Sequence, residues 1–354
     1  MKDKITVIIT IRNREAKRIE NQVESIRRNG ADPSFHIVDY GSDADYSSSY
    51  KAVCEKLHLQ YTHLYAEGLP WNKCRAINYG VEKAETPFIV TSDVDMIYEG
   101  NPFQWCLDNY EEKSMYHIET YWLPKSGNKD KASYAGHSNA GGFQFISIDA
   151  FLVSGGYDEH IEYWGPEDVD WPSRLKLLGY KQIWLPEDFK LFHTWHPKAW
   201  GNIYRPNVAE YNTGIYSFQN LMNPVISNNK VKLDEITDRP ILEKIKSSKP
   251  TELHFDAKKD FEYPHLAILS ETIRSSKFIK ISLSARLLPH LFKKSRLFFQ
   301  RVFNKFSKIT GSVCIPNYNM NFDLLFYQIP TMKKNGLIDY YFANDLSYAY
   351  LLFE

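Results

Sequence analysis

The stretch Ile5-Thr6-Val7-Ile8-Ile9-Thr10-Ile11 is a near-continuous run of apolar and β-branched residues. A run of this kind is typical of a strand buried on both faces. The chain then alternates helix-length and strand-length segments and reaches a second apolar strand at 87–91. Such alternation predicts an α/β fold with a mostly parallel sheet flanked by helices. Between these two strands we expect helices at 16–29, 46–57 and 71–83 and strands at 35–38 and 60–65.

The composition is that of an ordinary globular protein. The 354 residues are 43% apolar and 24% charged, and Lys+Arg and Asp+Glu both number 43, so net charge favours no particular partner. The four cysteines form no CxxC pair, which favours reduced thiols. No signal peptide precedes the first strand, and no apolar run reaches the roughly 18 residues that span a bilayer. We therefore expect a cytoplasmic protein, either free or peripheral on the cytosolic face of a membrane.

Two carboxylates follow the strand at 87–91. In an open α/β sheet, ligands bind beyond the carboxyl ends of the strands, and Asp93-Val94-Asp95 lies at such a place. Two acids one residue apart can hold a cation such as Mn²⁺ or Mg²⁺, which would neutralise a diphosphate and assist its departure. Surface acids often fall at this spacing, so the position after a buried strand is what makes the pattern informative.

A second acidic cluster reads Trp164-Gly165-Pro166-Glu167-Asp168-Val169-Asp170 and begins a helix expected to run to residue 178. Acids in a first turn stabilise the helix dipole, which is one explanation of the cluster. The preceding Trp-Gly pair favours another explanation, because indole offers a flat face to a sugar ring and glycine permits close backbone approach. A carboxylate in this cluster can deprotonate an acceptor hydroxyl.

Other polar residues also follow strand-like segments. His193 and His196 come after such a segment, and either imidazole can complete a metal site begun by the two acids, although a lone histidine is usually structural. Arg12 and Arg14 follow the first strand and can reach a diphosphate or a base. Asp39 follows the second strand and can bind a nucleobase or ribose, or simply mark a turn.

Taken in order, these segments resemble glycosyltransferases of the GT-A type. The opening 6–14 looks like the uridine-binding start of family 2 enzymes and of the animal β-1,4-galactosyltransferases, and 38–42 is similar to the family 2 VDDGS segment. Residues 71–80 look like a helix with donor-contacting basic residues. The spacing over 141–168 is similar to that of the galactosyltransferase motif Trp-Gly-Gly-Glu-Asp, with Pro166 in place of the second glycine. The resemblance covers roughly residues 5–200.

The resemblance implies a Rossmann-like GT-A fold and a set of residue roles. Asp95 and His193 are the implied metal ligands, with His193 preferred to His196. Asp168 is the implied catalytic base, and Glu167 is its acceptor-orienting neighbour. Donor contacts are implied for Ile11, Arg12, Arg14, Asp39, Lys73, Asp93, Val94, Trp164 and Gly165.

The composition changes in the last part of the chain. We expect a catalytic domain over 1–262 and a basic, mainly helical extension over 263–354. Residues 272–308 contain ten Lys/Arg and no Asp or Glu, interleaved with apolar side chains, and Pro289 would divide this segment into two helices. Such a segment can lie on an anionic membrane. It can equally pack as a helical pair on the catalytic domain with its bases in solvent.

The resemblance therefore implies an inverting, metal-dependent hexosyltransferase. It would move a sugar of the Gal, GalNAc, Glc or GlcNAc type from a UDP-sugar to a hydroxyl of a glycan or lipid-linked glycan, in bacterial surface polysaccharide or capsule biosynthesis. Neither a P-loop nor a GxGxxG motif is present, and no nucleic-acid partner is expected. Two alternatives remain: a sugar nucleotidyltransferase, or a non-catalytic carbohydrate-binding or scaffold protein on the same fold.

Overall fold

The computed structural model describes residues 1–135, 140–159, 161, 167–196, 239–256, 276–284, 337–343 and 348–354. The chain forms two compact units, and the second begins at Pro240. The sequence pattern places this division at residue 263.

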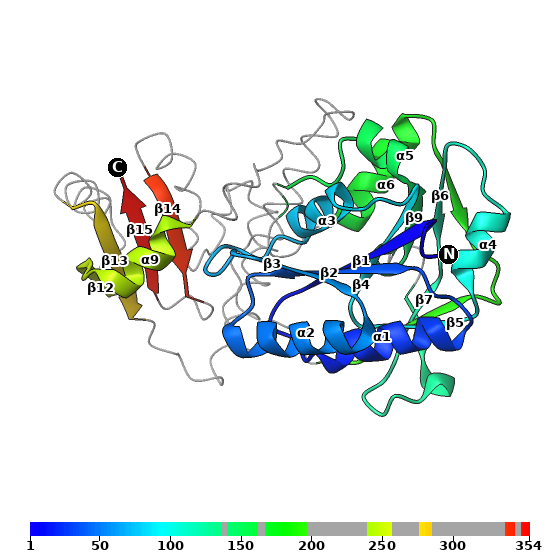
Figure 1. Cartoon of the computed structure of the whole chain (residues 1–354), viewed down its shortest axis with the longest axis horizontal. Helices are drawn as coiled ribbons and strands as arrows, with labels where there is room; N and C mark the ends of the chain where they lie inside the picture. Colours follow the sequence, from blue (N-terminus) through cyan, green and yellow to red (C-terminus); the bar gives the residue numbers. More distant parts are fainter. Residues whose placement is uncertain are drawn as a thin grey trace, which may run out of the picture. The chain divides into compact units, whose positions relative to one another are not determined.

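A seven-stranded sheet forms the centre of the first unit (Figure 1). Its strands run in the order β10-β6-β9-β4-β1-β2-β3. Every neighbouring pair is parallel except the two pairs that β9 makes with β4 and β6, so the predicted mostly parallel sheet is confirmed. The strands are β1 (Ile5–Ile11), β2 (Ser34–Tyr40), β3 (Gln60–Leu64), β4 (Phe88–Asp93), β6 (Ser114–His117), β9 (Gln144–Ser147) and β10 (Lys181–Trp184).

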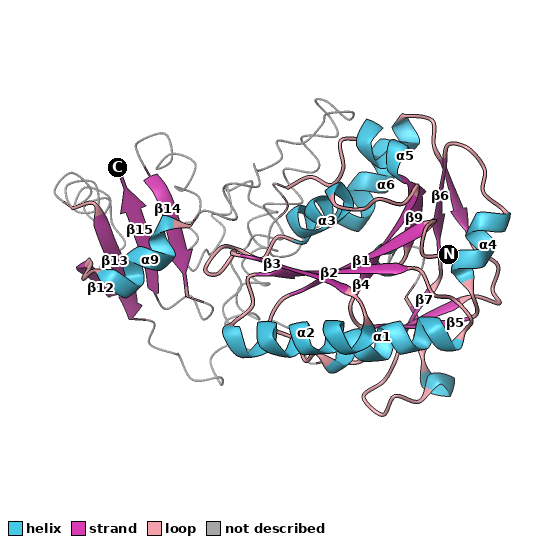
Figure 2. Ribbon diagram, in the orientation of Figure 1, coloured by secondary structure: helices cyan, strands magenta, loops and turns pink. Residues whose placement is uncertain are grey.

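Helices cover both faces of this sheet. Figure 2 shows α1 and α2 on one face and α3, α5 and α6 on the other. All seven residues of β1 are buried, as expected for a strand covered from both sides. The helices are α1 (Lys17–Arg28), α2 (Ala44–Leu57), α3 (Lys73–Glu82), α4 (Pro102–Asp108), α5 (Ile148–Val153) and α6 (Glu167–Leu177), with short 3₁₀ turns η1 (Lys129–Lys131) and η2 (Ala140–Gly142).

A smaller sheet follows the end of β4 and has the strand order β5-β11-β7-β8. Its strands are β5 (Met96–Glu99), β7 (Thr120–Trp122), β8 (Ser133–Tyr134) and β11 (Lys190–His193). Because β5 pairs antiparallel with β11, the end of β11 lies beside the start of β5. This pairing positions the histidines described below.

The described part of the second unit is one helix and a four-stranded sheet of order β12-β13-β15-β14. Its elements are α9 (Pro240–Ser247), β12 (Thr251–Asp256), β13 (Phe278–Ser284), β14 (Leu337–Phe342) and β15 (Tyr348–Phe353). The prediction of a helix at the start of the basic segment is wrong, because this part of the chain forms strand β13, which pairs with both β12 and β15. Residues 285–308 lie outside the described residues. Within the ranges described, no helix is both long and apolar enough to cross a membrane.

Candidate active site

The carboxyl ends of β1 and β4 lie side by side and form the centre of the site. Parallel pairing sets Thr10 beside Asp93, so the residues that follow both strands emerge at the same edge of the sheet. Ile11 and Val94 are buried and pack beneath this edge. The two acids on either side of Val94 belong to two separate clusters.

Asp95, His193 and His196 form the first cluster, which suits a divalent cation. Strand pairing sets His193 opposite Met96, the residue after Asp95. His193 Nε2 lies 3.4 Å from Asp95 Oδ1, and His196 Nε2 lies 3.2 Å from Asp95 Oδ2. One ligand atom from each residue lies within 4.8 Å of the other two. A carboxylate with two imidazoles is a mixed oxygen and nitrogen donor set, which fits Mn²⁺ or a similar cation better than Mg²⁺.

The surroundings of Asp95 keep its carboxylate ionised. Burial alone would raise the pKa of Asp95, but the hydrogen bond from His196 and the nearby charges of His193 and Arg18 hold it below its usual value. Arg18 Nη1 lies 3.4 Å from Asp95 Oδ2. Thr194 donates from its backbone nitrogen (2.8 Å) and its hydroxyl (3.0 Å) to the Asp95 carbonyl, which fixes the backbone of the cluster. The acid is therefore in the charge state that binds a cation.

Lys73, the first residue of α3, gathers the carboxylates of the second cluster. Its Nζ lies 2.6 Å from Asp93 Oδ1 and 3.4 Å from Glu167 Oε1. Asp168 lies close to the same ammonium group, across Gly141. A β-carbon at Gly141 would lie 3.2 Å from Asp168 Cβ and 3.5 Å from Lys73 Nζ, so glycine leaves room for this approach.

Burial and the charges within the second cluster determine which of its side chains carry a proton. Burial raises the pKa of Asp168 to about 7, the charges of Glu167 and Asp93 act in the same direction, and Lys73 opposes them. Burial alone would lower the pKa of Lys73, but Asp93 and Glu167 hold it well above its usual value, so the amine stays charged. A carboxylate that exchanges its proton near neutral pH suits general-base chemistry.

The start of α6 presents Asp168 to the site. Pro172 has no N–H and cannot donate to the Asp168 carbonyl four residues earlier. Gln144 Nε2 donates to that carbonyl instead, at 3.4 Å. Arg174 donates to Asp170 Oδ2 at 3.0 Å from Nε and 2.8 Å from Nη2, which anchors the next turn. The helix is thus tied to the sheet on the side that carries the catalytic candidates.

The two arginines expected to contact the donor lie on the loop after β1. Arg12 Nη1 donates to the Leu69 carbonyl at 2.7 Å. The backbone of Arg14 is held by the Tyr50 hydroxyl, which accepts from its nitrogen (2.8 Å) and donates to its carbonyl (2.6 Å). The loop is therefore ordered at the edge where a donor would bind, and the donor contacts themselves stay predictions.

Asp39 ends up inside the protein rather than at its surface. Its side chain is 0% exposed. Oδ1 accepts from the Ser42 nitrogen at 2.9 Å, and Oδ2 accepts from Ser47 Oγ (2.6 Å), Tyr61 OH (2.9 Å) and His63 Nδ1 (2.9 Å). These partners enclose the carboxylate, and its expected contact with a nucleobase or ribose stays a prediction. Its role here is to join the end of β2 to α2 and β3.

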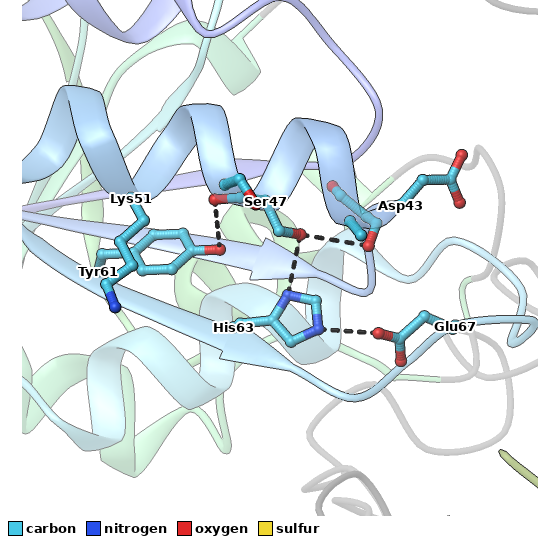
Figure 3. A pocket seen from close by; sticks show the side chains of 9 residues that line it. Asp43, Ser47, Lys51, Tyr61, His63 and Glu67 are labelled. Atoms are coloured by element: carbon cyan, nitrogen blue, oxygen red, sulfur yellow. Dashed lines mark hydrogen bonds and ion pairs between the residues drawn. The ribbon is translucent and has the colours of Figure 1, made fainter. Parts of the chain in front are cut away.

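A cavity of about 590 Å³ opens beside this network, on residues of α2, β3 and the adjoining loops. Figure 3 shows His63 between Ser47 and Glu67, and His63 Nε2 lies 2.9 Å from Glu67 Oε1. Burial alone would lower the pKa of His63, but its hydrogen bonds to Asp39 and Glu67 raise it to about 9, so the ring is cationic at neutral pH. The cavity is lined by Ser42, Asp43, Ala44, Ser47, Ser48, Lys51, Tyr61, His63 and Glu67.

The structure gathers the two acids of the DxD pattern, Lys73, the two acids that open α6 and His193 at one edge of the sheet. Both His193 and His196 lie beside Asp95, whereas the sequence led to a choice of His193 over His196. Trp164 and Gly165 lie outside the described residues. No motif in the sequence identified Arg18 or Gln144, because each reaches the site from a distant segment.

Comparison with known proteins bears on the first part of the chain. Residues 6–142, less than half of its length, match the family described as Glycosyl transferase family 2. No curated protein matches the sequence. This match shows that residues 6–142 are similar to family 2 glycosyltransferases, and together with the strand order it confirms the expected GT-A type of α/β fold.

Two solved structures are distant matches. GalNAc-T7, crystallised with UDP, GalNAc and Mn²⁺, is 15% identical over 61% of this chain and 47% of that one, with a TM-score of 0.49. The catalytic domain of Drosophila β1,4-galactosyltransferase 7, in complex with xylobiose, is 14% identical over 65% of this chain and 83% of that one, with a TM-score of 0.42. The chain thus spans about half the length of GalNAc-T7.

Proposed function

We propose that this chain is a metal-dependent glycosyltransferase that moves a hexose from a UDP-sugar to a hydroxyl of a glycan, with inversion of the anomeric carbon. One observation carries the proposal: the cluster of Asp95, His193 and His196, which could hold a cation, lies at the same sheet edge as Asp168, a carboxylate whose pKa is raised to about 7. The family match of residues 6–142 supports the reaction class.

The first cluster would hold the cation through Asp95, His193 and His196. When bound, the cation would neutralise the diphosphate and stabilise its departure. Arg12, Arg14 and the Lys73–Asp93 pair complete the donor side of the site in this proposal. Asp39 contributes indirectly, by fixing the end of β2.

Asp168 takes the acceptor proton in this proposal. The acceptor oxygen bonds to the anomeric carbon, the bond from that carbon to the diphosphate oxygen breaks, and UDP leaves with the bonding electrons. Attack from the face opposite UDP inverts the centre. Glu167 Oε2 is buried and has no hydrogen-bond partner among the described residues, so it can accept from a second acceptor hydroxyl and orient the sugar.

A donor screen tests the proposal. Purified protein is incubated with UDP-Gal, UDP-GalNAc, UDP-Glc and UDP-GlcNAc, with Mn²⁺ or with EDTA, and UDP release is recorded. We expect one donor to react only with Mn²⁺ and Asp168→Asn to lower kcat by about 10²–10⁴ while UDP still binds. NMR of the product anomer then reports inversion. No release from any donor by folded, Mn²⁺-loaded protein would contradict the proposal.

The same assay separates the alternatives. A sugar nucleotidyltransferase would release pyrophosphate from UTP and a sugar phosphate, and would not release UDP from a UDP-sugar. A non-catalytic carbohydrate-binding protein would show stabilisation by a sugar ligand without turnover.

The basic segment 272–308 bears on where in the cell the enzyme would bind its acceptor. We propose that it docks on an anionic membrane at the cytoplasmic side, so that the enzyme serves a lipid-linked acceptor in bacterial surface polysaccharide assembly. The support is the run of ten Lys/Arg without an acid. Flotation with vesicles of anionic and of neutral lipid at low salt tests this, and failure to float with the anionic vesicles would overturn it.

A further inference from the structure

Two indole rings lie exposed around the metal cluster. Trp122, the last residue of β7, is 53% exposed, and Trp195, between the two histidines, is 45% exposed. An isolated exposed apolar side chain is ordinary, but grouped aromatic surface beside polar residues often marks a binding site. A cation site alone does not explain why two indole rings are exposed beside it.

Strand register shows that Trp122 faces the same way as the metal ligand His193. In the small sheet, His193 pairs with Trp122 and Trp122 pairs with Ser133. Directly paired residues point to one face of a sheet. Accordingly the Trp122 and His193 rings are stacked, with centroids 5.7 Å apart and planes 25° apart.

Trp195 lies two residues after His193, just beyond the end of β11. The pairing continues there, because the Leu123 nitrogen donates to the His193 carbonyl at 2.9 Å. Lys125 Nζ lies 5.3 Å from the centroid of the Trp195 ring, a cation–π contact that steadies the indole. Tyr134 belongs to the neighbouring row, opposite Tyr121, and so faces the other side of the sheet.

We propose that Trp122 and Trp195 form the platform on which the acceptor sugar stacks; this inference rests on the proposed glycosyl transfer. A pyranose ring presents C–H groups on its faces, and these carry partial positive charge. The face of an indole ring is electron-rich, so stacking of the two is favourable, while the sugar hydroxyls at the ring edge keep their hydration.

The acceptor fits this surface better than the donor does. A UDP-sugar is held through its diphosphate, and the residues suited to that charge are the cation cluster and the arginines after β1. A neutral acceptor offers only hydroxyls and C–H faces, so its binding energy must come from surfaces of this kind. The indoles are interleaved with His193 and His196, which breaks the apolar surface and does not suit insertion into lipid.

Methyl β-glycosides, which carry no aromatic aglycone, are the probes. With UDP and Mn²⁺ present, their binding is measured by saturation-transfer NMR, and acceptor KM is measured with the active donor. We expect Trp122→Ala and Trp195→Ala each to raise acceptor Kd and KM about tenfold, and Trp122→Phe to stay within about threefold of the wild type because it keeps an aromatic face. UDP affinity should not change.

Tyr134→Ala is the matched control, since this ring is 50% exposed on the same sheet but on its other face. We expect it to leave acceptor binding unchanged. Unaltered glycoside binding in both alanine variants, or a loss of UDP affinity in place of glycoside affinity, overturns the platform. If no donor reacts, the proposed function fails, whereas the NMR binding experiment still decides the platform.

Discussion

Lys73 supplies the positive charge that the second cluster depends on. It is only 17% exposed and lies 2.6 Å from Asp93, 3.4 Å from Glu167 and close to Asp168. We expect Lys73→Met to lower the free energy of unfolding by roughly 3 kcal/mol at neutral pH, because partly buried carboxylates lose their only close cation among the described residues. The loss should shrink as pH falls, since protonation of the acids removes their repulsion. Urea unfolding at several pH values measures both effects.

Lys181→Met is the control for this change, because Lys181 forms an exposed ion pair with Glu111 at 2.9 Å. Exposed pairs of this kind contribute about 0–1 kcal/mol. Equal losses in the two variants would show that Lys73 carries no special electrostatic role.

His63 makes stability depend on pH in a definite direction. Its pKa is raised from 6.5 to about 9 in the folded protein, by hydrogen bonds to Asp39 and Glu67 that outweigh burial. Because this pKa is raised, the stabilisation by His63 is complete below the pKa of the unfolded state. It is lost as pH rises through the pKa of the folded state. We expect the wild type to have a higher free energy of unfolding than His63→Gln. The difference should be larger at pH 6 than at pH 9.5. A margin that does not change between these pH values would contradict the assignment.

The turn between β2 and α2 is held by a close approach of two backbones. Gly41 has φ +67°, and a β-carbon there would lie 2.3 Å from the Ala66 carbonyl carbon. We expect Gly41→Ala to cost roughly 3 kcal/mol or more, because both the backbone conformation and the contact must change. The variant should also weaken UDP binding, since the neighbouring loop carries Glu67 and Leu69, which hold His63 and Arg12.

Gly127→Ala isolates the conformational part of that cost. Gly127 has φ +70°, but a β-carbon there would have no atom of the described residues within 4 Å. We expect it to lose only about 1 kcal/mol, the cost of left-handed backbone for a residue with a side chain. Urea unfolding of both variants gives the difference, and equal values would refute the close-approach explanation.

Long elements with one strong period could be predicted from the sequence, whereas short ones could not. Strand β1 occupies the predicted residues, and the elements that follow it as far as β4 start and end within two residues of their expected positions. Strands of two to four residues, such as β8 and β5, carry too few residues to show a period. The segment Ile279-Lys280-Ile281-Ser282 alternates with a period of two, yet its basic charge led to the prediction of a helix.

The candidate site was predictable where it follows strands, because all parallel strands deliver their next residues to one edge. Asp95 was found in this way, whereas Asp168 was found from the Trp-Gly pair and the acids that begin a helix. Asp39 follows the same rule, but its burial depends on Tyr61 and His63, which only the packing of β3 brings to it. Arg18 and Trp122 lie beside the candidate metal cluster but belong to other segments, so no local pattern could identify them.

Cation binding should stabilise the first unit as a whole, because the ligands come from segments about 100 residues apart. Asp95 lies between β4 and β5, His193 is the last residue of β11, and His196 lies three residues further along the chain. At Mn²⁺ one hundred times its Kd, the folded state gains about 2.7 kcal/mol. We expect Mn²⁺ to raise Tm by several degrees, EDTA to reverse the shift, and Asp95→Ala to abolish it. Asp108→Ala removes an exposed carboxylate at the end of α4 and should respond like the wild type. A shift that persists in Asp95→Ala would place the cation elsewhere on the protein, and the proposed metal ligands would have to be abandoned.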